Sequence, residues 1–114
     1  DGPAPGIIVE DEAAVETFTA KGSSLFEWTV GANTQKYTGK FYVSAGSTIV
    51  VTVSIAPSNK TVKAGVIWPD GTRDYVSGSG VLYSTFTAPS SGYYKVFVEN
   101  GNSTSVTVEG SYIV

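Results

Sequence analysis

Residues Val81–Val98 read VLYSTFTAPSSGYYKVFV, and this stretch points most directly to a fold class. Two runs rich in aromatic and β-branched residues flank a breaker, Ala88–Gly92, that contains proline, serine and glycine. Runs of this kind predict strands, and the breaker predicts a corner between them. Because Pro89 has no amide hydrogen to donate to a ladder, it belongs at the end of the first strand. Along the second strand, alternation places Tyr94, Val96 and Val98 on one face and Tyr93, Lys95, Phe97 and Glu99 on the other.

The same signals recur along the chain at short, regular spacing. The clearest period-two run is Thr48–Ile55, in which Ile49, Val51 and Val53 alternate with their neighbours. Strands are expected at residues 15–20, 24–30, 37–43, 48–55, 61–68, 73–76, 81–87, 93–99 and 103–114, and residues 7–9 are a candidate edge strand. Eight to nine short strands without a long helix predict an all-β protein, a two-layer antiparallel β-sandwich with jelly-roll-like or immunoglobulin-like topology.

Glycine, proline and asparagine mark the connections between these strands. Pro69-Asp-Gly71 is typical of a tight turn, and Asn100-Gly101 is a strong short-range signal for a hairpin. Residues 31–36 and Ser77–Gly80 are expected to be loops. The chain of 114 residues has the length of one domain. We expect an acidic, flexible lead-in over residues 1–13 and a single sandwich domain over residues 14–114.

The composition excludes several classes of function. The chain has neither cysteine nor histidine, so it has no disulfide, no thiolate zinc site and no imidazole general base. A formal net charge of −3 argues against nucleic acid as a partner, and no apolar run is long enough to cross a membrane. The lack of both methionine and cysteine suits an oxidising exterior. We therefore expect a secreted protein in its mature form.

Catalysis has weak support in the sequence. Serine and threonine are plentiful, but the imidazole that most often activates such nucleophiles is missing. A small hydrolase that uses a Ser–Lys arrangement or a pair of carboxylates is chemically allowed, although no spacing in the chain singles out such a pair. We therefore expect that the protein is not an enzyme.

Three segments have the order and turn chemistry of a known family. They are residues 41–53, FYVSAGSTIVVTV; residues 66–71, VIWPDG; and residues 86–98, FTAPSSGYYKVFV. In these segments the chain resembles the bacterial pre-peptidase C-terminal domain, a small jelly-roll-like sandwich appended to secreted proteases and collagenases. The resemblance implies a non-catalytic accessory or binding role outside the cell. The family often carries acidic residues before the Pro-Asp-Gly turn, whereas Lys63–Trp68 contains none.

Acidic residues supply the candidate metal site. Carboxylate oxygens are ligands that calcium prefers, and folding would have to bring the amino-terminal acids near two later ones. The candidate ligands are Glu10, Asp11, Glu12, Asp70 and Asp74, with Glu16 close by. Their spacing matches no EF-hand loop, and a run of charges is more often a solvated surface. Apart from this calcium hypothesis, we expect no cofactor.

Aromatic residues on the outer faces of the predicted strands are the candidate ligand-binding residues. They are Tyr42, Tyr75, Tyr83, Tyr93 and Phe97. An exposed aromatic platform stacks on sugar rings or anchors a partner protein. The competing interpretation is cross-strand pairing, which stabilises a sheet by about 0.2–1 kcal/mol per pair. Trp28 and Trp68 share strand faces with apolar neighbours, so we expect both in the core.

Three functional hypotheses follow. The first is a secreted, non-catalytic binding or accessory module, a monomer that recognises a polysaccharide or an extracellular protein. The second is a freestanding secreted inhibitor or antibacterial effector. The third is the small hydrolase, which predicts a concave polar pocket that contains a lysine or paired acids.

Overall fold

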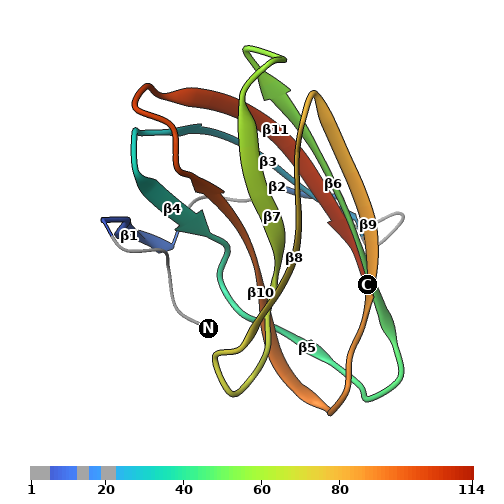
Figure 1. The fold of residues 1–114 in the computed structure, drawn as a ribbon. Helices are drawn as coiled ribbons and strands as arrows, with labels where there is room; N and C mark the ends of the chain where they lie inside the picture. Colours follow the sequence, from blue (N-terminus) through green and yellow to red (C-terminus); the bar gives the residue numbers. More distant parts are fainter. Residues whose placement is uncertain (1–5, 13–15, 19–22) are drawn as a thin grey trace.

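The computed structural model describes residues 6–12, 16–18 and 23–114, which form two packed β-sheets (Figure 1). None of these residues is helical. The strands are β1 (Ile8–Glu12), β2 (Glu16–Phe18), β3 (Ser23–Val30), β4 (Thr34–Tyr37), β5 (Phe41–Val43), β6 (Thr48–Ala56), β7 (Thr61–Ile67), β8 (Arg73–Ser79), β9 (Val81–Thr87), β10 (Gly92–Asn100) and β11 (Val106–Ile113). The count exceeds the expected eight to nine because β1 forms at the candidate edge strand and the expected strand at residues 37–43 is divided in two.

The two sheets interleave along the chain. Sheet A contains six strands in the order β1-β4-β10-β7-β8, with β5 also paired to β10. Sheet B contains five strands in the order β2-β3-β11-β6-β9. The pairs are antiparallel except for β1 with β4. Because β8, β9, β10 and β11 lie alternately in sheets A and B, most neighbours within a sheet are distant in sequence. The prediction of a two-layer sandwich is confirmed.

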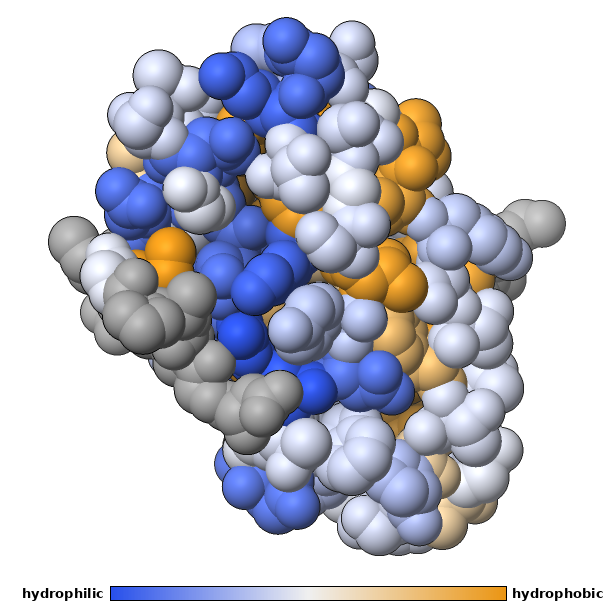
Figure 2. All heavy atoms as spheres, viewed as in Figure 1, coloured by the Kyte–Doolittle hydropathy of each residue, from blue (hydrophilic) through white to orange (hydrophobic). Residues whose placement is uncertain are grey.

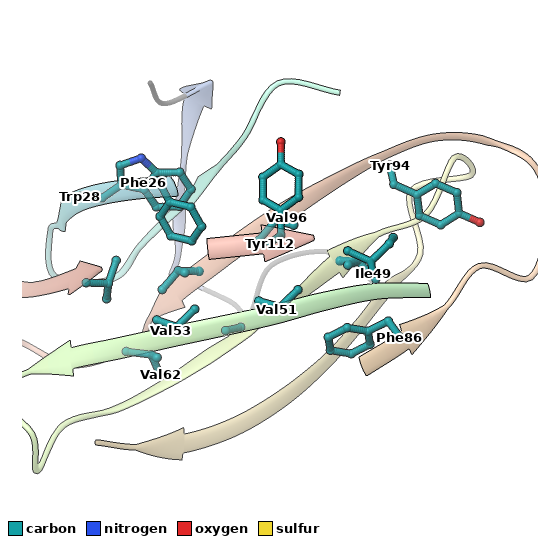
Figure 3. Packing of buried hydrophobic residues seen from close by; sticks show 14 of the residues in the cluster. Phe26, Trp28, Ile49, Val51, Val53, Val62, Phe86, Tyr94, Val96 and Tyr112 are labelled. Carbon is teal, nitrogen blue, oxygen red and sulfur yellow. The ribbon is translucent and has the colours of Figure 1, made fainter. Parts of the chain in front are cut away.

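The core lies between the sheets and follows the alternation in the sequence. Ile49, Val51 and Val53 of β6 and Val96 of β10 belong to this core, and all four are buried (Figure 3). Burying an aliphatic side chain of this size stabilises a fold by about 1.5–3 kcal/mol. The tryptophans agree with the sequence analysis: Trp28 is buried against Phe26, with ring centroids 4.0 Å apart, and Trp68 packs against the core partly buried.

The corner between β9 and β10 carries the chain from sheet B to sheet A. Ala88 is buried and is held to the neighbouring turn by two backbone hydrogen bonds, from Ala88 N to Ser47 O (2.9 Å) and from Gly46 N to Ala88 O (2.8 Å). The Tyr94 hydroxyl donates to Ser90 O at 2.6 Å. The breaker predicted at residues 88–92 is therefore a sheet-to-sheet corner, fixed by contacts with the turn that precedes β6.

The expected strand at residues 37–43 is interrupted by Thr38. This buried residue donates from its backbone N to Val96 O at 2.9 Å, while its hydroxyl accepts from Val96 N at 3.0 Å. The hydroxyl thus takes the acceptor position that a backbone carbonyl has in a regular ladder, and pairing resumes only at β5. The prediction of a loop at residues 31–36 is also wrong at its end, because Thr34–Tyr37 form strand β4, which pairs with β10.

The prediction of a flexible loop at Ser77–Gly80 is wrong as well. Strand β8 continues to Ser79, which pairs with Thr61 of β7. Serine and glycine have a low strand propensity, but the backbone groups of β7 offer them hydrogen-bond partners here. Pairing between strands therefore overrides the local preference for a loop. Only Gly80 turns the chain: it has a φ of 74°, and its carbonyl accepts from Ile55 N at 2.8 Å.

The hairpin predicted at Asn100-Gly101 does not form, because β10 lies in sheet A and β11 in sheet B. Asn100 is fully buried, and its Nδ2 donates to three backbone carbonyls, those of Val30 (3.1 Å), Gly31 (3.0 Å) and Thr104 (2.9 Å). Its Oδ1 accepts from Asn102 N at 2.9 Å. The asparagine therefore ties the crossing between sheets to the end of β3 instead of forming a two-residue turn.

The amino-terminal segment contributes a strand to each sheet. Ile8–Glu12 pair in parallel with β4, and Glu16–Phe18 pair with β3. The rest of the strand expected at residues 15–20 lies outside the described residues, and the division into a lead-in and a domain at residue 13 stays a prediction. In the described ranges there is no helix with the length and apolarity that a membrane crossing requires.

Candidate functional site

The outer face of sheet A carries aromatic and cationic side chains together. Directly paired residues in neighbouring strands share a face, and Val96 and Val98 of β10 point into the core. The outer face therefore consists of Gln35 and Tyr37 from β4, Tyr42 from β5, Lys63, Gly65 and Ile67 from β7, Arg73, Tyr75 and Ser77 from β8, and Tyr93, Lys95, Phe97 and Glu99 from β10.

An ion pair is buried on this face. The Nη1 of Arg73 donates to Glu99 Oε1 at 2.6 Å and to Gln35 Oε1 at 2.7 Å. The side chains of Arg73 and Glu99 are only 5% and 3% exposed. The guanidinium also lies 4.9 Å from the ring centroid of Phe97 and 5.3 Å from that of Tyr75. Two aromatic rings thus shield the charges from water, which strengthens their mutual attraction.

Gly65 makes this shielding geometrically feasible. It lies opposite Phe97 on one side and Tyr75 on the other, and it carries no side chain between them. The two rings meet edge to face with centroids 6.1 Å apart. Phe97 is consequently fully buried, so its prediction as an exposed binding residue is wrong, and Tyr75 is only half-exposed.

Tyr42 and Tyr93 form an exposed pair at the other end of β10. They are paired residues of β5 and β10, they are 56% and 53% exposed, and their rings meet edge to face at 5.6 Å. The Nζ of Lys40 lies 4.9 Å from the Tyr93 ring centroid. Tyr83 is also exposed, but it lies on β9 in sheet B. Of the five predicted aromatic residues, only Tyr42 and Tyr93 form an exposed platform.

A cavity of about 380 Å³ lies at the Glu99 end of the same face. Its polar lining comes from three strands and two loops: Asn33, Thr61, Lys63, Ser77, Glu99 and Asn102. Lys63 Nζ lies 3.8 Å from Glu99 Oε2, and Asn102 Nδ2 donates to Thr61 O at 2.9 Å. Figure 2 shows hydrophilic residues gathered around β4, β10 and β7, where this cavity lies.

The acidic residues proposed for calcium are divided between the two edges of sheet A. Glu10, Asp11 and Glu12 belong to β1 at one edge, while Asp74 lies on β8 at the other, about four strand spacings or 19 Å away. Among the described residues, no three acids gather closely enough to hold a metal ion. The described residues therefore form no calcium site, and the calcium hypothesis stays a prediction.

Asp70 has a local structural role. It lies in the tight turn after β7, where Gly71 N donates to Trp68 O at 2.9 Å, as the Pro-Asp-Gly sequence predicted. The Oδ1 of Asp70 accepts from Thr72 N at 2.9 Å, and this hydrogen bond lowers the pKa of its carboxyl. The exposed Asp70 carboxylate therefore stabilises the turn, and Asp70 is not among the residues that line the cavity.

Comparisons with known proteins identify the fold. No family model and no curated protein sequence matches the chain. A solved structure of the pre-peptidase C-terminal domain of a collagenase from Bacillus anthracis superposes with a TM-score of 0.60 at 15% identity, over 77% of this chain and 86% of that one. The periplasmic inhibitor of g-type lysozyme from Aeromonas hydrophila, PliG, superposes with a TM-score of 0.59 at 16% identity, over 87% of this chain and 91% of that one. The chain therefore has the fold of the pre-peptidase C-terminal domain, as its strand and corner motifs predicted.

Proposed function

We propose that this protein is a secreted, non-catalytic module that binds a polysaccharide through the outer face of sheet A. The observation that carries the proposal is the exposed pair of Tyr42 and Tyr93, whose rings meet edge to face on the outer face of the sheet. Aromatic rings of this kind offer apolar area for a sugar ring while their hydroxyls stay in water. The solved structures of similar fold, a collagenase domain and a periplasmic inhibitor, support a place outside the cytoplasm.

A polysaccharide fits this face better than a protein partner. Protein interfaces have an apolar, charge-depleted centre, whereas lysines lie over the rings here, with Lys40 Nζ 4.9 Å from the Tyr93 centroid and Lys95 Nζ 4.6 Å from that of Tyr37. Other exposed large apolar side chains, Val81 and Ile113, lie on sheet B. A surface that alternates rings with hydrogen-bond donors suits a hydroxyl-rich ligand.

The hydrolase hypothesis meets its geometric requirement, since the cavity contains Lys63 beside Ser77. However, a lysine that activates a serine must be neutral. Lys63 is engaged as a cation, with its Nζ 3.8 Å from Glu99 Oε2 and 5.2 Å from the ring centroid of Tyr75. This arrangement supports a binding role for the cavity.

Replacing Tyr42 or Tyr93 with alanine is expected to weaken retention on the bound polysaccharide about tenfold, equivalent to about 1.4 kcal/mol, because each substitution removes one stacking surface. Affinity electrophoresis and pull-down on soluble and insoluble polysaccharides measure the effect. The matched control is Tyr83→Ala, which removes an exposed ring from sheet B and is expected to leave binding unchanged. Retention on no polysaccharide would refute the proposal in favour of a protein partner.

A second candidate function is inhibition of a lysozyme. It is supported by the superposition on PliG, an inhibitor of g-type lysozyme, which extends over 87% of this chain and 91% of that one. An inhibitor is expected to abolish lysis of a bacterial suspension by g-type lysozyme near equimolar concentration, whereas the proposed polysaccharide module is expected to leave the initial rate unchanged. A turbidity assay with increasing amounts of the protein separates the two functions.

A further inference from the structure

The outer face of sheet A holds most of the positive charge of an acidic protein. The whole chain has a formal net charge of −3. Along β7, β8 and β10 and beside Tyr93, the outer face carries four cations, Lys40, Lys63, Arg73 and Lys95, and one acid, Glu99. Arg73 and Glu99 neutralise one another at 2.6 Å within the buried layer. Lys63 lies 3.8 Å from the same carboxylate, so four cations share one acid and this part of the face has an excess of three positive charges, equal in number to its three lysines.

Each of these lysines is positioned over an aromatic ring. The Nζ atoms lie 4.9 Å from the Tyr93 centroid for Lys40, 4.6 Å from Tyr37 for Lys95 and 5.2 Å from Tyr75 for Lys63. Such cation–π contacts restrict a long side chain without consuming its hydrogen-bond donors. The three ammonium groups are thus partly ordered before a ligand binds, which reduces the entropy lost on binding.

The lysines follow β10 from the exposed tyrosine pair to the cavity. Tyr93 and Glu99 are six residues apart on one strand, a distance of about 20 Å. Lys95 lies between them, and Lys63 lies opposite Glu99 on β7. The acidic strand β1 borders the sheet beyond β4, so the cationic track follows β10 and β7 and does not extend across the whole face.

The cavity at the end of this track has the size and chemistry of a sugar subsite. Its volume of about 380 Å³ lies within the range of small-ligand sites. Lys63 and its paired residue Ser77 supply donors from neighbouring strands. Glu99 is 3% exposed and is bound to Arg73 through Oε1, while its Oε2 is 3.8 Å from Lys63 Nζ, beyond hydrogen-bond distance.

We propose that the ligand is an acidic polysaccharide, whose chain lies along β10 from Tyr42 and Tyr93 to the cavity, where Lys63 and Ser77 bind the carboxylate of one sugar. This inference rests on the proposed polysaccharide-binding function and names the class of polymer. Carboxylates pair with the lysines, and the apolar faces of the sugar rings stack on the exposed tyrosines.

The test compares polygalacturonate, alginate and hyaluronate with the carboxyl-reduced form of each polymer. We expect at least one acidic polymer to bind about tenfold more tightly than its reduced form. We also expect the affinity for this polymer to fall as the salt concentration increases. Lys63→Gln is expected to weaken binding of the acidic polymer about tenfold and to weaken binding of the reduced polymer less, so that the preference for the acidic polymer falls. The control is Lys36→Gln, which removes the same charge from the opposite face of β4, where Lys36 pairs with Val98.

Three outcomes would overturn the inference. Equal affinity for the acidic and reduced polymers would show binding without charge recognition, which leaves the proposed function intact. Tyrosine-dependent binding that Lys63→Gln does not change would remove the cavity from the site. Competition by polyglutamate at the affinity of the best polysaccharide would identify an acidic protein as the partner class. Chemical-shift changes at the backbone amides of Ser77 and Asn102 on addition of an acidic trisaccharide would place the ligand in the cavity.

Discussion

Replacing Glu99 with alanine is expected to lower the free energy of unfolding by about 3–5 kcal/mol, because it leaves the Arg73 guanidinium buried without its carboxylate. Arg73 is 5% exposed at its side chain and its Nε already has no hydrogen-bond partner, so only Gln35 Oε1 at 2.7 Å would remain for its charge. Urea denaturation followed by fluorescence of the buried Trp28 measures the change. Arg73→Met is also expected to lower the free energy of unfolding, since it leaves the buried carboxylate with Lys63 alone, at 3.8 Å.

The double variant Arg73→Met/Glu99→Leu tests the cause. Removing both charges also removes the need to solvate either one, so the double variant is expected to lose less stability than either single variant. Glu109→Ala on the exposed face of β11 is the control for loss of an acid and is expected to change stability by less than about 0.5 kcal/mol. Losses that simply add up would mean that Arg73 and Glu99 do not act as a pair.

Gly65→Ala is expected to destabilise the protein by about 3 kcal/mol, the upper end of the usual range for overpacking. A Cβ at this position would lie 2.1 Å from Asp74 O and 2.5 Å from the Cα of Tyr75. Both atoms belong to the backbone of β8, so relief requires β7 and β8 to separate, with loss of ladder hydrogen bonds. A lowered midpoint in urea denaturation, with an unchanged dependence on urea concentration, is the expected result.

Gly101→Ala provides the matched control for this substitution. A Cβ on Gly101 would meet no atom within 4 Å, so its effect is expected to stay within about 0.5 kcal/mol. Because β8 carries Arg73 and Tyr75, Gly65→Ala is also expected to loosen the covering of the buried ion pair. Equal stability of the two variants would contradict the close approach of β7 and β8 at Gly65.

Much of the sandwich could be predicted from local pattern. The alternation at Ile49, Val51 and Val53 placed these residues in the core because a strand turns successive side chains to opposite faces. The corner after Pro89 and the turn at Pro69 were predicted for similar reasons, since proline limits φ and cannot donate to a ladder. The same alternation correctly placed Tyr42 and Tyr93 on an outer face.

The Asn100-Gly101 hairpin failed because a turn signal describes only four residues, whereas sheet membership depends on long-range pairing. Asn100 finds its carbonyl partners at Val30 and Gly31, about seventy residues earlier. No local pattern contains this information. The lysine at position 63 was similarly unremarkable in the sequence until β7 paired with β10 and brought it opposite Glu99.

The sequence alone determined that this protein is a β-sandwich and which faces of its strands are apolar, because these properties depend on residue type and on the two-residue period of a strand. It also determined that imidazole and thiolate chemistry are absent, because the chain has neither histidine nor cysteine. Only the tertiary structure decided that Phe97, Arg73 and Glu99 are buried on an outward face and that Lys63 lines a cavity. The physical reason is that alternation sets the direction of a side chain but not what covers it. The cover comes from neighbouring strands, here Gly65 and Tyr75, whose pairing is fixed by the packing of the whole chain.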